Sequence, residues 1–336
     1  MPAEFERHSG CWMLWPERAD NWRNGAKPAQ AAFAQVATAI ASGEALTVGV
    51  SAAQFRNARA RLPSQVRVVE LSSNDAWMRD CGPTFVIDAK GRRRGIDWTF
   101  NAWGGLRGGL YFPWDKDDAV AQKVLELEQA DRYRTSFVME GGAIHVDGQG
   151  TCLTTEECLL SDVQERNPGF TREDYAEIFR RYLGVTNVLW LRKGIAGDDT
   201  HGHVDDLARF VDASTVVTVF EDDFADSNYE PLAENLALLK SMKDQDGNAL
   251  RVETLPMPEP VWFDGQRLPA SYANFYIANK IVLVPTFNDP ADRVALEKLA
   301  ALFPAREIVP IYCRDLVLGL GTIHCLTQQL PAPAAD

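Results

Sequence analysis

The chain has 336 residues, of which 46% are hydrophobic and 24% charged, and its formal net charge is −13. This length is sufficient for one large hydrophobic core or two smaller ones. The excess of negative charge argues against nucleic acid and anionic membrane surfaces as partners, and it suits a small cationic ligand.

The N-terminal segment has no basic stretch followed by an apolar one, so we expect no signal peptide. No run of about 18 apolar residues occurs, which argues against a membrane-spanning helix. Six cysteines are scattered without a CxxC pair, and in a chain of this length they predict reduced thiols. Together these features predict a cytoplasmic protein.

Strands and helices alternate along the chain. A buried strand is predicted at 11–15, where aromatic residues are dense, and further strands at 46–50 and 66–71. Five helices are predicted because apolar residues recur at helical spacing. They cover residues 28–42, 117–128, 171–183, 231–243 and 291–303. Pro28 opens the first helix, and Thr171 with Asp174 gives a near match to a capping box at the start of the third.

The same order occurs five times: a helix, one or two strands, then a polar residue at a turn or at the start of a strand. These polar residues follow one another at intervals of about 60 residues, which suggests repeated supersecondary units. They are Asp80, Glu140, His203, Asn274 and Cys325.

Five similar units fit a closed ring better than an open array, because a ring leaves no unit uncapped. Two adjacent α/β domains are the alternative. However, the Pro/Gly-rich stretches 101–114 and 255–269 contain aromatic residues and do not resemble linkers. We therefore expect a single α/β domain over residues 1–336.

In a ring of units, equivalent positions converge near the axis, so we expect Asp80, Glu140, His203 and Cys325 to face one central cavity. Taken singly, each has a structural interpretation: a surface ion pair for Asp80, a turn acid for Glu140, and core residues for His203 and Cys325. Their common position in the repeat favours a functional site.

His203 and Asp205 are two residues apart, so in an extended segment both side chains leave the same face. A carboxylate beside a histidine fixes its tautomer and makes it a better base. With Cys325 nearby, these residues form a Cys/His/Asp set of the kind that activates a thiol. Cys325 also follows Gly319 and Gly321, where the missing Cβ atoms let a substrate approach the backbone.

The proposed site would hold three acids, Asp80, Glu140 and Asp205, around one thiol. Carboxylates form planar, paired contacts with a guanidinium group. The residues therefore favour an amidine or guanidine substrate, attacked at its central carbon.

One competing motif is His201-x-His203-x-Asp205, which resembles the metal-binding HxHxDH motif of metallo-β-lactamase-like hydrolases. Here the last position is Asp206, and His324 is the only histidine that remains downstream. A metal-dependent hydrolase is thus the weaker alternative. The glycine-rich stretch 104–109 does not fit GxGxxG, and no GxSxG is present.

Motifs over nearly the whole chain resemble those of the agmatine deiminases, which belong to the guanidino-group-modifying (pentein) superfamily and are related to bacterial-type peptidylarginine deiminases. The matching segments are MPAEFERHSGCWMLWPERADNWR, SSNDAWMRDCGPTFV, FNAWGGL, YFPWDKDD, MEGGAIHVDGQGTCLTTEECLL, RNP, GHVDDLARFV, SYANFYIAN and GLGTIHCLTQQLP. The resemblance implies a five-bladed α/β propeller built from ββαβ-type units.

The resemblance also implies roles for individual residues. Cys325 would be the nucleophile, His203 the acid and base, and Asp205 and Asp80 the ligands of the guanidinium group. Glu140 would line the site, and Trp77 would pack against the substrate. The reaction would be hydrolysis of agmatine to N-carbamoylputrescine and ammonia through a covalent cysteine adduct, in putrescine and polyamine biosynthesis. No metal or organic cofactor is implied, and homodimers are common in the family.

Two departures from the family pattern concern the substrate tail and the turn before the thiol. Related sequences read roughly TDGHVDN where this chain has Thr200 to Asp206, so Asp198 and Asp199 are candidates for binding a distal amine. Leu320 stands where relatives have glycine, which predicts a stiffer turn beside the pocket. Deimination of arginine, peptidyl-arginine or another guanidine is the alternative activity, and non-catalytic guanidine binding is a third hypothesis.

Overall fold

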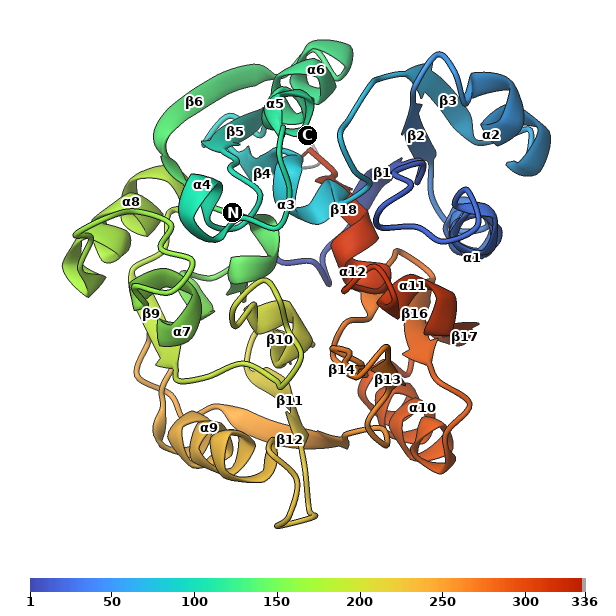
Figure 1. The fold of residues 1–336 in the computed structure, drawn as a ribbon. Coiled ribbons are helices and arrows are strands. Elements are labelled where there is room, and N and C mark those ends of the chain that lie inside the picture. Colours follow the sequence, from blue (N-terminus) through green and yellow to red (C-terminus); the bar gives the residue numbers. More distant parts are fainter. Residues whose placement is uncertain (334–336) are drawn as a thin grey trace.

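The computed structural model describes residues 1–333 and has a mixed α/β fold. Five small sheets lie around the middle of the molecule, and most of the longer helices lie on their outer side (Figure 1). In the described part of the chain each sheet is open, with two edge strands.

All five sheets share one strand pattern. Each begins with an antiparallel pair and continues with a parallel pair. A helix connects the parallel strands, as parallel pairing requires a long crossover. In the first sheet the order is β18-β1-β2-β3, so the last strand of the chain pairs with the first. Its strands are β1 (His8–Leu14), β2 (Leu46–Val50), β3 (Arg67–Glu70) and β18 (Thr327–Pro331).

The other four sheets have three strands each, and a short hairpin lies between the fourth and fifth sheets in sequence. In chain order the strands are β4 (Thr84–Ile87), β5 (Arg93–Thr99) and β6 (Asp131–Val138); β7 (His145–Val146), β8 (Thr151–Thr155) and β9 (Asn187–Leu191); β10 (Ala208–Phe210), β11 (Thr215–Phe220) and β12 (Arg251–Pro256); the hairpin β13 (Trp262–Phe263) and β14 (Gln266–Arg267); and β15 (Tyr276–Ile277), β16 (Ile281–Thr286) and β17 (Glu307–Tyr312).

The five predicted helices are the crossover helices, with ends within a few residues of those expected. They are α1 (Lys27–Ala41), α6 (Val120–Leu127), α8 (Arg172–Leu183), α9 (Tyr229–Ser241) and α10 (Pro290–Leu302). The predicted capping box is confirmed, since the Thr171 and Asp174 side chains each bind the other's backbone. The helix predicted at 117–128 is interrupted at Ala119, and the preceding turn, α5 (Asp115–Asp118), is separately fixed by hydrogen bonds to Asn74.

Short helices and strands without a clear hydrophobic periodicity were not predicted from the sequence. They include α2 (Phe55–Arg61), α4 (Gly105–Gly108), α7 (Glu156–Leu160), α11 (Arg314–Val317) and the β13–β14 hairpin. Tertiary contacts fix such elements. For example, the Arg59 guanidinium on α2 donates to the backbone oxygens of Leu62 and Val66, which follow the helix.

The five polar positions of the repeat each lie shortly before the first strand of a sheet, which confirms the repeated layout. Asn274 precedes β15 directly. The others belong to, or begin, one short helical turn: α3 (Met78–Cys81), η1 (Gly141–Ala143), η2 (Val204–Asp206) and α12 (Ile323–Leu326).

The buried core is apolar, and the helices that connect the parallel strands of each sheet contribute side chains to it. Its larger part includes Phe33, Phe210 and Phe275, while Tyr175 and Phe179 belong to a smaller cluster. All six cysteines are buried and none forms a disulfide in the structure. Among residues 1–333, no helix has both the length and the apolar character that crossing a membrane requires.

Candidate active site

The Cys325 thiol lies on α12, at the end of the glycine-containing turn. Asn274 fixes this turn, because its Oδ1 accepts hydrogen bonds from Thr322 Oγ1 (2.7 Å) and from the backbone N of His324 (3.0 Å). The Asn274 Nδ2 donates to Cys325 Sγ at 3.2 Å. The fourth polar position of the repeat therefore supports the fifth.

Gly321 allows a tryptophan to pack beside the thiol. A Cβ at this position would lie 2.7 Å from the Trp77 ring and 3.1 Å from Cys325 Sγ, so only glycine fits without displacement. Leu320 has φ of 75°, in the left-handed region that favours glycine, and its residue lines the cavity. The turn is thus held in a conformation that a leucine adopts at some cost.

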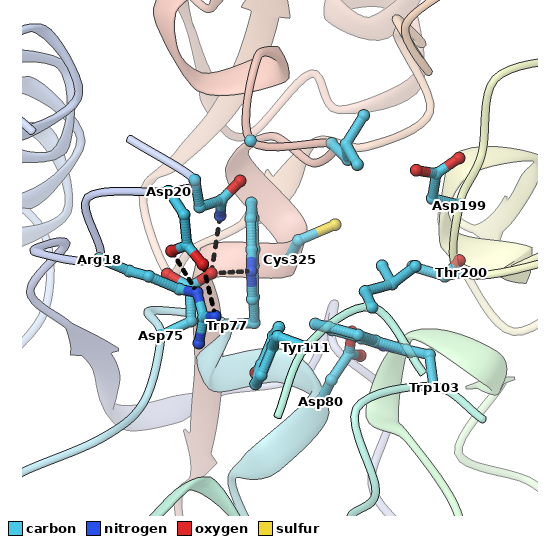
Figure 2. Close-up of a pocket in the computed structure, with 14 residues that line it drawn as sticks. Arg18, Asp20, Asp75, Trp77, Asp80, Trp103, Tyr111, Asp199, Thr200 and Cys325 are labelled. Atoms are coloured by element: carbon cyan, nitrogen blue, oxygen red, sulfur yellow. Dashed lines mark hydrogen bonds and ion pairs between the residues drawn. The ribbon is translucent and has the colours of Figure 1, made fainter. Parts of the chain in front are cut away.

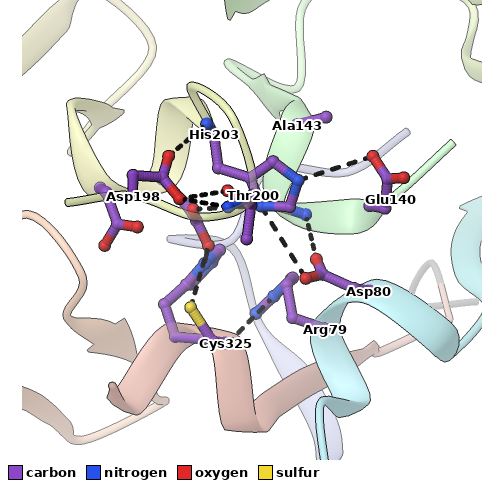
Figure 3. A network of polar contacts seen from close by, with 12 residues as sticks. Arg79, Asp80, Glu140, Ala143, Asp198, Thr200, His203 and Cys325 are labelled. Atoms are coloured by element: carbon purple, nitrogen blue, oxygen red, sulfur yellow. Dashed lines mark hydrogen bonds and ion pairs between the residues drawn. The ribbon is translucent and has the colours of Figure 1, made fainter. Parts of the chain in front are cut away.

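Carboxylates surround His203 (Figure 3). Its Nδ1 lies 3.8 Å from Asp80 Oδ2 and 3.9 Å from Asp205 Oδ1, and its Nε2 lies 3.5 Å from Glu140 Oε2. Burial lowers the pKa of His203, but the charge of Asp80 and the neighbouring Cys158 and Glu140 side chains outweigh it and hold the pKa well above its usual value. The ring is therefore an imidazolium at neutral pH.

Residues 203–205 are not extended, so the geometry considered for a strand does not apply. The chain forms a 3-10 turn over Val204–Asp206, stabilised by a backbone hydrogen bond from Leu207 to Val204. His203 and Asp205 still face the same site, because a tight turn brings their side chains to a common side.

Asp80 is buried, which excludes the interpretation as a surface ion pair. Its Oδ1 accepts a hydrogen bond from the backbone N of Gly142 (2.9 Å), and its Oδ2 accepts one from Trp103 Nε1 (3.0 Å). Burial raises the pKa of Asp80 to about 6. Each oxygen retains a second lone pair for another donor.

Asp205 links the thiol to a buried network that sequence reasoning missed. Its Oδ2 lies 3.9 Å from Cys325 Sγ and 2.6 Å from His324 Nδ1. The other ring nitrogen of His324 contacts Glu4 at 2.7 Å, and Glu4 accepts a hydrogen bond from Arg209 at 2.8 Å. Although burial opposes ionisation, the pKa of Asp205 is lowered, chiefly by His324. Its Oδ1 has no hydrogen-bond partner and is free to accept one.

Glu140 supports His203 from behind rather than lining the cavity. Its Oε1 accepts a hydrogen bond from Arg166 Nε at 3.0 Å, and both side chains are fully buried. Burial raises the pKa of Glu140, but the Arg166 and His203 charges lower it more, so the group is ionised. Like His203 and Asp205, Glu140 is not among the residues that line the cavity. Its predicted role in binding the substrate stays a prediction.

A cavity of about 180 Å³ opens in front of Cys325 (Figure 2). Acidic side chains outnumber basic ones on its wall, which suits a cationic ligand. The lining residues are Arg18, Asp20, Asn21, Asp75, Trp77, Asp80, Trp103, Leu110, Tyr111, Asp199, Thr200, Gly319, Leu320 and Cys325.

The structure separates the two candidate ligands for a distal amine. The Asp198 carboxylate is occupied by its own loop, because it accepts hydrogen bonds from the backbone N of Thr200, Gly202 and His203. Asp199 instead lines the cavity across from Trp77, and its only side-chain partner among residues 1–333 is Gln266, at 3.3 Å and 3.4 Å. Burial raises the pKa of Asp199. Asp199 therefore remains a candidate and Asp198 does not.

Asp75 is a further residue that the sequence did not single out. It lines the cavity and accepts hydrogen bonds from Trp22 Nε1 (2.7 Å) and Trp77 Nε1 (3.0 Å). Burial raises the pKa of Asp75 to about 6. In the sequence, Asp75 is distinguished only by its position two residues before Trp77. This spacing does not predict a contact between the two side chains.

The metal-binding alternative requires His201 beside His203 and Asp205. In the structure His201 Nε2 contacts Ser161 Oγ at 3.1 Å, and His201 belongs to none of the buried groups of three potential metal ligands found in residues 1–333. The HxHxD segment thus does not converge on one point.

Burial raises the pKa of the Cys325 thiol well above its usual value, and the carboxylates of Asp205, Asp206 and Asp80 raise it further. Without a cation in the site, the group is therefore a neutral thiol. A positive charge bound between the same carboxylates would act in the opposite direction.

Comparisons with known proteins find similarity along almost the whole chain. The profile of the Porphyromonas-type peptidyl-arginine deiminase family matches residues 1–331. The agmatine deiminase of Pseudomonas aeruginosa (strain LESB58) is 50% identical over 353 residues, covering 99% of this chain and 95% of the relative.

Two solved structures are also similar. The agmatine deiminase of Enterococcus faecalis has a TM-score of 0.95 and 47% identity, with 99% of this chain and 95% of that chain covered. A substrate-bound agmatine deiminase of C. jejuni has a TM-score of 0.89 and 26% identity, with 99% and 96% covered.

Proposed function

The chain belongs to the Porphyromonas-type peptidyl-arginine deiminase family, and from this premise we propose that it hydrolyses agmatine to N-carbamoylputrescine and ammonia. The observation that carries the proposal is that Cys325 and Asp80 line an acidic cavity, with His203 and Asp205 in contact with them.

Two carboxylates hold the guanidinium group of the substrate. Asp205 Oδ1 has no partner, and both oxygens of Asp80 have room for one more donor. A guanidinium presents several N–H donors in one plane and fits such paired acceptors. The carboxylates therefore orient its central carbon toward Cys325 Sγ.

The bound cation helps to form the nucleophile. Its charge offsets the carboxylates that raise the pKa of Cys325, and Asn274 Nδ2 donates a hydrogen bond to the sulfur. The thiol releases its proton to solvent, the thiolate attacks the central carbon, and a C–S bond forms. His203, an imidazolium before the reaction, gives its proton to the departing nitrogen, which leaves as ammonia.

The second half of the reaction reverses these roles. His203 is now neutral and takes a proton from water, which attacks the carbon of the covalent adduct. The C–S bond breaks and the thiolate leaves. The hydroxyl proton of the product restores the neutral thiol, and N-carbamoylputrescine is released. Glu140, fixed by Arg166, holds the His203 ring in place through both steps.

The remainder of the cavity receives the aliphatic tail. The rings of Trp77 and Trp103 line it, and Asp199 provides a negative charge for the distal amine. We also propose that the five sheets are the blades of a five-bladed α/β propeller that the whole chain forms as one domain. Support for this comes from the common strand pattern and from the pairing of β18 with β1.

The proposal is tested by measuring ammonia release from agmatine, arginine and a peptidyl-arginine. Agmatine should be turned over with the highest kcat/KM, and Cys325→Ala should abolish turnover. The matched control is Cys313→Ala, which removes another buried thiol outside the cavity. Preference for arginine or peptidyl-arginine would contradict the substrate assignment, and turnover by Cys325→Ala that a chelator abolishes would favour the metal alternative.

A further inference from the structure

A second buried thiol lies next to the proposed catalytic histidine. One ligand atom from each of Glu140, Cys158 and His203 lies within 4.8 Å of the other two. Cys158 belongs to α7, a segment that the mechanism above does not use. All three residues are at most 1% exposed.

Three polar atoms of this group make no hydrogen bond, although carboxylates lie near both nitrogens of His203. Both ring nitrogens of His203 and Glu140 Oε2 are buried without a hydrogen bond, whereas buried polar atoms are nearly always paired. The His203 Nε2 and Glu140 Oε2 atoms are 3.5 Å apart. Two such ligands, each about 2.0–2.1 Å from a tetrahedral zinc ion, lie about 3.3 Å apart. The spacing therefore suits an ion between them.

We propose that Glu140, Cys158 and His203 form an inhibitory site for a thiophilic divalent cation such as Zn²⁺. Thiolate, imidazole and carboxylate are the ligand types that zinc takes in proteins. Cys158 binds as a thiolate and His203 binds through the lone pair of Nε2. Metal binding therefore releases two protons to solvent, one from the Cys158 thiol and one from Nε2 of the His203 imidazolium. Arg166 stays on the other carboxylate oxygen, Glu140 Oε1, at 3.0 Å.

The metal would inhibit the enzyme because it occupies one of the two ring nitrogens of His203. This inference rests on the catalytic role proposed for His203 above. A neutral imidazole carries one proton and one lone pair. When Nε2 gives its lone pair to the metal, the proton must sit on Nδ1, the nitrogen that faces Asp80 and Asp205. His203 then has no site left for the proton that it must take from water.

Two other buried groups contain three potential ligands each. In the group of Glu4, His145 and His324, both His324 nitrogens and the Glu4 carboxylate are already engaged in close contacts. The remaining group combines Cys325 with two neighbouring acids, Asp205 and Asp206. Because it would place the metal on the nucleophile itself, the experiment must distinguish the two thiols.

Cobalt provides a readout that does not depend on activity. The metal-free full-length protein is titrated with Co²⁺, and the thiolate-to-cobalt charge-transfer absorption is recorded. The wild type and Cys325→Ser should show this absorption, and Cys158→Ala should lose it. Cys152→Ala is the matched control, because Cys152 is a buried thiol of the same core cluster that belongs to none of the ligand groups. It should keep the absorption.

Activity is then measured with Zn²⁺. Zn²⁺ should inhibit ammonia release from agmatine by the wild type, and the half-inhibiting concentration should rise at least about 10-fold in Cys158→Ala. Metal-free Cys158→Ala should retain turnover. If this variant does not fold, Cys158→Ser replaces it, since a hydroxyl gives no thiolate absorption.

Loss of the absorption in Cys325→Ser with retention in Cys158→Ala would overturn the proposal and place the metal on the nucleophile. Absence of the absorption from the wild type would also overturn it. The proposed function fails separately, if the metal-free wild type does not turn over agmatine. An intact cobalt absorption in that case would still support the metal site.

Discussion

The support of the nucleophile by the N-terminal segment can be tested with Glu4→Gln. Glu4 is 2% exposed, and its carboxylate contacts Arg209 Nη2 at 2.8 Å, His324 Nε2 at 2.7 Å and the backbone N of Ile277 at 2.8 Å. The amide keeps the shape but removes the charge, which leaves a buried guanidinium uncompensated. Breaking a buried ion pair in this way costs about 3–5 kcal/mol, so we expect the free energy of unfolding to fall by that amount.

The assay is urea unfolding at several pH values. Burial raises the pKa of Glu4, but Arg209 and His324 lower it more, so the folded-state pKa is well below its usual value. The carboxylate therefore contributes stability above its unfolded-state pKa of about 4.3, and this contribution is lost as the pH falls through the folded-state pKa. The difference between wild type and Glu4→Gln should be constant near neutrality and shrink in acid.

Glu6→Gln, in the same segment but only partly buried, is the control and should change stability by at most about 0.5 kcal/mol. A Glu4→Gln effect below about 1 kcal/mol at pH 7, or one independent of pH, would refute the reasoning about the buried network.

Three further outcomes concern catalysis. Gly321→Ala places a Cβ 2.7 Å from the Trp77 ring and 3.1 Å from Cys325 Sγ, so kcat should fall on the order of 100-fold through misplacement of the thiol; a wild-type kcat would show that the contact is unimportant. The pKa of Asp80 is about 6, and only the ionised carboxylate pairs with a guanidinium. We therefore expect kcat/KM for agmatine to decline as the pH falls below 6. A kcat/KM that stays constant down to pH 5 would contradict this role of Asp80. Asp199→Asn should raise KM for agmatine about tenfold with little change in kcat, which corresponds to about 1.4 kcal/mol; an equal rise for an alkylguanidine without a distal amine would argue against contact with that amine.

Much of the fold could be predicted from the sequence, because the units bury one face of each crossover helix and so show a 3.6-residue period. The convergence of Asp80, Glu140, His203 and Cys325 could also be inferred. Equivalent positions of repeated units come close together when the units are arranged around a common middle. The local backbone structure around these residues was harder to predict from the sequence. The turn after His203 follows from backbone hydrogen bonds, and the i, i+2 spacing alone could not distinguish it from a strand.

The buried network behind the nucleophile could not be predicted. Glu4 lies in an unremarkable N-terminal segment, and only the tertiary fold brings it to His324, 320 residues later. Asp198 and Asp199 are equivalent in sequence, yet one carboxylate closes its own loop and the other faces the cavity. The direction in which each carboxylate points depends on the backbone conformation of the loop. Residue type and spacing alone do not predict that conformation.

The central claim is that the Cys325 sulfur forms a covalent bond with the guanidinium carbon. The most direct measurement is mass spectrometry of wild-type protein that is acid-quenched during turnover of saturating agmatine, since acid protonates His203 and stops hydrolysis of the adduct. We expect the peptide that contains Cys325 to gain the mass of agmatine less ammonia, and Cys325→Ala protein to gain nothing. An adduct on another residue, or agmatine turnover by Cys325→Ala, would contradict the account.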